Sequence, residues 1–143
     1  MKASHFYIVN LVSSFLSSRN IVHNRNVLKV QYEFEPKKSS IVTISNLLKD
    51  YDLHSRTYLA DFDTLRRERK NAFLHLRISD GRFVMLRSIS TEGNVTFFDP
   101  VINKNIEISK PAFLKLWSNV VIYSNTSESV VKSSNKKCEK VRS

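Results

Sequence analysis

Apolar residues recur every three or four positions through the first third of the chain, a spacing that predicts helices. Ser4 is a suitable N-cap for the first helix, which is predicted to end near Asn20. Weaker apolar spacing over residues 24–35 predicts a second helix that Pro36 ends, and residues 41–51 predict a third. The first helix carries its apolar side chains on one face: Ile8, Leu11, Val12, Phe15 and Leu16.

The apolar period changes to two after His54, which predicts β-strands. Turn residues at Ser79-Asp80-Gly81 and at Glu92-Gly93-Asn94 separate successive strands. Two short helices interrupt them, one predicted to be capped by Asp63 and run to Arg69, the other capped by Ser109. The predicted strands cover residues 56–60, 73–78, 82–89, 95–98, 105–108 and 120–123. Helices followed by a meander of antiparallel strands are typical of the α+β class.

The composition predicts one folded domain followed by a tail. Hydrophobic residues make up 41% of the chain and charged residues 25%, which is ordinary for a globular protein. After Ser124 the apolar periodicity stops, and serine, asparagine and lysine dominate. We therefore expect a domain over residues 1–124 and a disordered basic tail over residues 125–143.

The formal net charge of +10 is the one unusual bulk property. It is compatible with a polyanionic partner or an anionic membrane surface, and equally with scattered lysines that keep the domain soluble. The single cysteine, Cys138, excludes an intramolecular disulfide and fits a reducing compartment. No apolar run approaches the ~20 residues of a membrane span, and no secretory leader opens the sequence, so we expect a cytoplasmic protein.

Few residues suggest metal or cofactor chemistry. The histidines His5, His23, His54 and His75 match no metal-ligand spacing, and Gly81 and Gly93 stand alone and form no phosphate-binding loop. Cys138 could act as a nucleophile only if a base lay beside it, and its polar, lysine-rich surroundings suggest none. The sequence therefore predicts neither a bound metal nor a cofactor.

An ordered set of segments resembles one known family. The segments are Asn71-Ala72-Phe73-Leu74-His75-Leu76, Arg82-Phe83-Val84-Met85-Leu86, Val95-Thr96-Phe97-Phe98-Asp99-Pro100, a helix over Pro111–Trp117 and a strand over Val120–Tyr123. Together they resemble the peptidase domains that remove double-glycine leaders from bacteriocins and lie at the N-terminus of their ABC exporters. The resemblance covers residues 5–124. It implies a papain-like fold in which a helical half and a sheet half enclose a cleft.

The resemblance also implies where the catalytic groups of that family would fall. Its nucleophilic cysteine, at the start of the first helix, corresponds to Tyr7, and its histidine base corresponds to Arg82. Its histidine-orienting carboxylate corresponds to Asp99, and the glutamine that helps to hold the oxyanion would lie near Met1, where none is present. A phenol is a poor acyl nucleophile, and a guanidinium cannot accept a proton at physiological pH. We therefore expect no peptidase activity. Asp99 either pairs with Arg82 or simply ends a strand at an Asp-Pro turn.

The resulting hypothesis is a non-catalytic, peptidase-like domain that binds a peptide or a partner protein in the old substrate cleft. Tyr7, Arg82, Phe83 and Asp99 are the expected cleft residues. Related domains are joined to exporters or to vitamin K epoxide reductase-like membrane enzymes. The resemblance therefore implies a role in membrane-associated export or thiol oxidation, at the inner face of the membrane. The alternative is a basic nucleic-acid-binding domain, because Gly81-Arg82-Phe83-Val84 resembles part of an RNA-binding strand and residues 65–70 are strongly basic.

Overall fold

The computed structural model describes residues 7–36, 39–68, 72–78 and 81–126. His5, Cys138 and residues 127–143 of the predicted tail lie outside these ranges. None of the helices in the described part of the chain is long and apolar enough to cross a bilayer.

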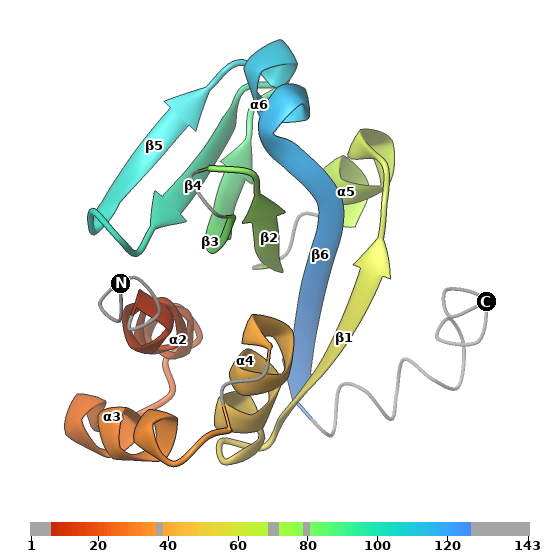
Figure 1. Ribbon diagram of the computed structural model, residues 1–143. Helices are drawn as coiled ribbons and strands as arrows, with labels where there is room; N and C mark the ends of the chain where they lie inside the picture. The colour runs from red at the N-terminus through yellow and green to blue at the C-terminus, as the bar shows by residue number, and fades with distance from the viewer. Residues whose placement is uncertain (1–6, 37–38, 69–71, 79–80, 127–143) are drawn as a thin grey trace.

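Three helices form the N-terminal layer, as their apolar spacing predicts. Asn24 and Ser39 cap the second and third of them, each through a side-chain oxygen that accepts from backbone N–H groups in the first turn. The first helix ends at Ser18, two residues before the predicted end at Asn20, whose φ of 60° lies in the left-handed region that asparagine tolerates. Figure 1 shows the three helices gathered together, away from the two short helices that come later in the chain. They are α2 (Tyr7–Ser18), α3 (Arg25–Glu33) and α4 (Ser40–Lys49).

The strands form one six-stranded antiparallel sheet with the order β1-β6-β2-β3-β4-β5. From β2 to β5 the chain is the predicted meander. The last strand departs from it, because β6 returns to lie between β1 and β2 instead of extending the far edge (Figure 1). The strands are β1 (Leu53–Leu59), β2 (Ala72–Leu76), β3 (Arg82–Ile89), β4 (Val95–Asp99), β5 (Lys104–Ile108) and β6 (Trp117–Thr126).

The sheet separates two hydrophobic cores. Helices α2, α3 and α4 bury their apolar faces against one side of the sheet, where Phe73, Phe83 and Met85 meet them. The helices α5 (Phe62–Glu68) and α6 (Lys110–Leu116) contribute to a second core on the other side, with Leu74 and Val84. Strands β2 and β3 are therefore covered on both faces, which explains why their sequence is a nearly continuous apolar run.

Four local predictions need correction. The first strand starts at Leu53, three residues before its predicted start at Arg56. The oxygen that caps α5 belongs to Asp61, whose Oδ1 accepts from the backbone N–H of Thr64 at 2.8 Å, and not to Asp63. The last strand starts at Trp117, three residues before the predicted start, because it continues directly from α6. It also ends at Thr126, so that the first two residues of the predicted tail pair with β1.

Candidate functional site

Tyr7 joins the first helix to the sheet. It is the first residue of α2, and its side chain reaches β3, where the phenol oxygen accepts a hydrogen bond of 2.9 Å from the backbone N–H of Phe83. Only 8% of Tyr7 is exposed. The residue at the predicted nucleophile position therefore contacts the strand that carries the predicted base position.

Arg82 and Asp99 form the predicted ion pair. They lie on the neighbouring strands β3 and β4, and Nη1 of Arg82 donates to both carboxylate oxygens of Asp99, at 3.0 and 3.2 Å. Asp99 is almost fully buried, and its Oδ1 also accepts from the backbone N–H of Val101 at 2.9 Å. The predicted pairing of Asp99 with Arg82 is therefore confirmed, and Asp99 also holds the turn after β4.

The surroundings of Tyr7 keep its phenol protonated. Burial raises the pKa of Tyr7 above the ordinary value of 10.0, although the hydrogen bonds with Phe83 and Ser40 and the charge of Arg82 act in the opposite direction. A neutral phenol in this position has no nucleophilic oxyanion to offer. Arg82 cannot act as a base, because a guanidinium keeps its proton.

The four predicted cleft residues differ in their access to solvent. Phe83 is 3% exposed and its ring belongs to the core beneath α2, so it offers no face on which a base or an aromatic ligand could stack. Tyr7 and Asp99 are likewise buried. The side chain of Arg82 is 15% exposed and is the member of the group that solvent reaches best.

Two residues near this group carry contacts that the sequence pattern does not indicate. Asn10, one helical turn after Tyr7, donates from its side-chain amide to the carbonyl of Pro100 at 3.2 Å and so ties α2 to the turn after Asp99. His75 lies at 2.9 Å from the hydroxyl of Ser118 through Nδ1, and its ring meets Phe83 edge-on at 5.1 Å. Burial, helped by the charge of Arg77, lowers the pKa of His75, so the imidazole is neutral at physiological pH.

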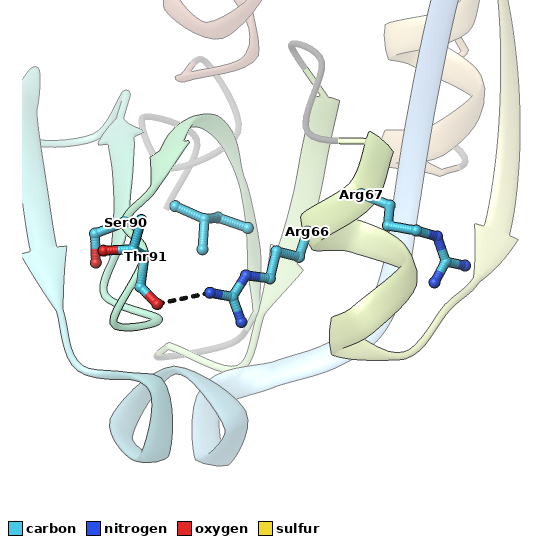
Figure 2. A pocket seen from close by; sticks show the side chains of 5 residues that line it. Arg66, Arg67, Ser90 and Thr91 are labelled. Atoms are coloured by element: carbon cyan, nitrogen blue, oxygen red, sulfur yellow. Dashed lines mark hydrogen bonds between the residues drawn. The ribbon is translucent and has the colours of Figure 1, made fainter.

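A separate pocket of about 280 Å³ lies beside α5, on the side of the sheet opposite α2. Ile89, Ser90 and Thr91 line it together with Arg66 and Arg67. Figure 2 shows that Arg66 reaches toward Thr91, to whose carbonyl it donates at 2.7 Å, whereas the side chain of Arg67 turns away. The two cations therefore do not converge on one ligand position.

Within the described ranges, no group of three or more His, Cys, Asp or Glu side chains gathers to hold a metal ion.

Comparison with known families decides the relationship. A sequence model of the Peptidase C39 family matches residues 12–129, which is most of the chain. The chain belongs to the Peptidase C39 family. The matched range includes Arg82 and Asp99 and begins after Tyr7. No curated protein sequence matches this C39 domain significantly.

Solved structures confirm the papain-like fold of the C39 domain. A double-glycine-motif protease from an AMS/PCAT transporter, in complex with its leader peptide, is 12% identical with a TM-score of 0.69 and covers 84% of each chain. The peptidase domain of the Streptococcus ABC transporter ComA is 15% identical with a TM-score of 0.68, over 82% of this chain and 88% of that one. The C39-like domain of a toxin-secretion ATP-binding protein from Vibrio parahaemolyticus is 15% identical with a TM-score of 0.65, over 84% and 96% of the two chains.

Proposed function

We propose that this C39 domain binds a leader-type peptide and does not cleave it. The observation that carries the proposal is the pair of contacts at the two positions where the family would place its nucleophile and base. Tyr7 is a buried, protonated phenol that holds the backbone of β3, and Arg82 is held by the carboxylate of Asp99. Neither group can attack a carbonyl carbon or remove a proton from a nucleophile.

The ligand class follows from the fold and from the members of the family. One similar domain has a leader peptide bound to it, and the fold of the present chain matches that domain over 84% of its length. A peptide ligand also suits the chemistry that remains here, because an oriented guanidinium recognises the polar and acidic groups of an extended chain. The proposed partner is therefore a peptide, or the protein that carries it.

The proposed setting is the cytoplasmic side of a membrane-associated export or thiol-oxidation system. The similar domains from Streptococcus and Vibrio are parts of an ABC transporter and of a toxin-secretion ATP-binding protein. The net charge of +10 supports the same setting, because anionic lipid attracts basic segments close to the membrane.

The decisive measurement combines binding with cleavage. A fluorescent peptide that carries an amphipathic leader, a double glycine and several residues beyond it is titrated with the protein. We expect saturable binding by anisotropy and an intact peptide by mass spectrometry after prolonged incubation. The Cys138→Ser variant serves as the control, because Cys138 is the single thiol of the chain. Specific cleavage after the double glycine that persists in this variant would contradict the proposal.

A further inference from the structure

The guanidinium of Arg82 is only partly used inside the domain. Its Nη1 makes both contacts with Asp99, whereas Nε and Nη2 donate to no acceptor within the part of the chain that the structure describes. The side chain of Arg82 is 15% exposed, so solvent reaches part of it. Arginine has five such donors in a planar fork, and a carboxylate is the ligand that this fork matches best.

Asp99 fixes the orientation of that fork. Its carboxylate is 4% exposed and is itself held by the backbone N–H of Val101, so it cannot follow a rotating arginine. Tyr7 adds a second constraint, because its bond to Phe83 holds the backbone next to Arg82 against helix α2. A guanidinium fixed from two sides loses little conformational entropy when it binds, which favours affinity.

The predicted place of Arg82, at the base position of the family, suggests which carboxylate it would bind. In a cysteine peptidase the base lies beside the scissile carbonyl, first to activate the thiol and then to activate water. In the second step the base takes a proton from water, the oxygen adds to the acyl carbon, and the carbon–sulfur bond breaks as the thiolate leaves. The peptide is then released with a new C-terminal carboxylate beside the base. An arginine in place of the base binds the charged carboxylate of this product more strongly than the neutral carbonyl of the intact peptide bond.

From this chemistry we infer that the domain binds the free C-terminal carboxylate of a peptide that has already been cleaved, with Arg82 as the binding residue. The inference rests on the proposed function and adds the ligand class to it. The domain would thus retain or sense released leaders in preference to uncleaved precursors.

Three peptides of one leader sequence test the inference on the unmodified protein. One ends at the second glycine as the free acid, one ends there as the amide, and one continues beyond it. We expect the acid to bind at least about tenfold more tightly than either of the others, as a charge-assisted hydrogen bond predicts. Equal affinities for the three peptides would overturn the inference and leave the proposed function standing. Binding of none of them would overturn both.

A variant assigns the effect to Arg82. The double substitution Arg82→Gln with Asp99→Asn removes the cation without leaving a buried carboxylate unpaired. We expect it to reduce the acid-to-amide affinity ratio to about one, with the fold verified by circular dichroism. Arg67→Gln, which removes one charge from an exposed position of α5, is the matched control and should keep the ratio. If the acid-to-amide affinity ratio is unchanged in the double variant, another group binds the carboxylate and the assignment to Arg82 is wrong.

Discussion

Tyr7 is a buried side chain that links the first helix to the sheet. The start of a helix normally favours a reactive group, because the exposed N–H groups stabilise negative charge there. Here the phenol of Tyr7, the first residue of α2, accepts from the backbone N–H of Phe83. Since burial raises its pKa, the group that occupies the position is a neutral hydrogen-bond acceptor. The assignment of Tyr7 to the nucleophile position rests on the family resemblance and stays a prediction. Its contact with β3 has no local signal in the sequence, because it depends on tertiary packing.

Tyr7→Phe should destabilise the domain by about 1–3 kcal/mol, because it leaves the buried N–H of Phe83 without its acceptor. Tyr58→Phe is the matched control, since this half-buried tyrosine contributes a ring contact with Tyr123 and loses only its hydroxyl in the variant. We expect the control to stay within about 0.5 kcal/mol of the parent protein. Urea unfolding at pH 7 measures both values, and an equal effect of the two substitutions would contradict the assigned role of Tyr7.

At the scale of the elements, most of the fold could be predicted from the sequence because the apolar period is clear. Strand β3 has the predicted bounds, and α3 and α4 differ from their predictions by one or two residues at each end. The predicted bounds are wrong where pairing with a distant strand, and not the local apolar pattern, decides the secondary structure. The first three residues of β6 carry no strand-like alternation, and their register against β2 shifts between Leu74 and Leu76. They join the strand because Trp117 pairs with Leu76 of β2 and the carbonyl of Asn119 accepts from the backbone N–H of Ala60.

The cap of α5 yields a prediction at the same scale. Asp61→Ala should lower the thermal midpoint of the domain more than Asp63→Ala, because Asp61 accepts the hydrogen bond from Thr64, whereas Asp63 only places a charge in the first turn. Hydrogen bonding to Thr64 lowers the pKa of Asp61 from its ordinary 3.8. The stabilisation by Asp61 is therefore present above that ordinary value and is lost as the pH falls through the lower pKa of the folded state.

The measurement for this helix is a pair of thermal unfolding series, one near pH 7 and one under acidic conditions. The difference between the parent protein and Asp61→Ala should be clear near neutrality and shrink in acid. If Asp63→Ala were the more damaging substitution at neutral pH, Asp61 would not be the residue that caps the helix.

At the scale of the whole molecule, the fold class was predictable and the strand order was not. A meander follows from local turn chemistry, since Gly81 and Gly93 reverse the chain with φ values of 96° and 95°. The placement of β6 between β1 and β2 depends on contacts between the two ends of the sheet region, for which the sequence contains no local signal. The candidate site also depends on long-range contacts. Tyr7 and Phe83 are 76 positions apart in the chain, and tertiary folding brings them into contact.

The C-terminal segment carries the last prediction, which concerns the proposed location at a membrane. Residues 127–143 include five basic and two acidic residues, a net charge of +3: Lys132, Lys136, Lys137, Lys140 and Arg142 against Glu128 and Glu139. A truncation should follow Thr126, because Asn125 and Thr126 pair with His54 and Leu53 of β1. We expect the shortened protein to keep its circular dichroism spectrum and to adsorb more weakly to anionic vesicles at low salt, since each basic residue near such a surface contributes ~1 kcal/mol.

Neutral vesicles, and anionic vesicles at high salt, should not distinguish the two proteins, because the attraction is electrostatic. Equal adsorption to anionic vesicles at low salt would mean that the segment serves solubility and would remove the charge argument for a membrane location.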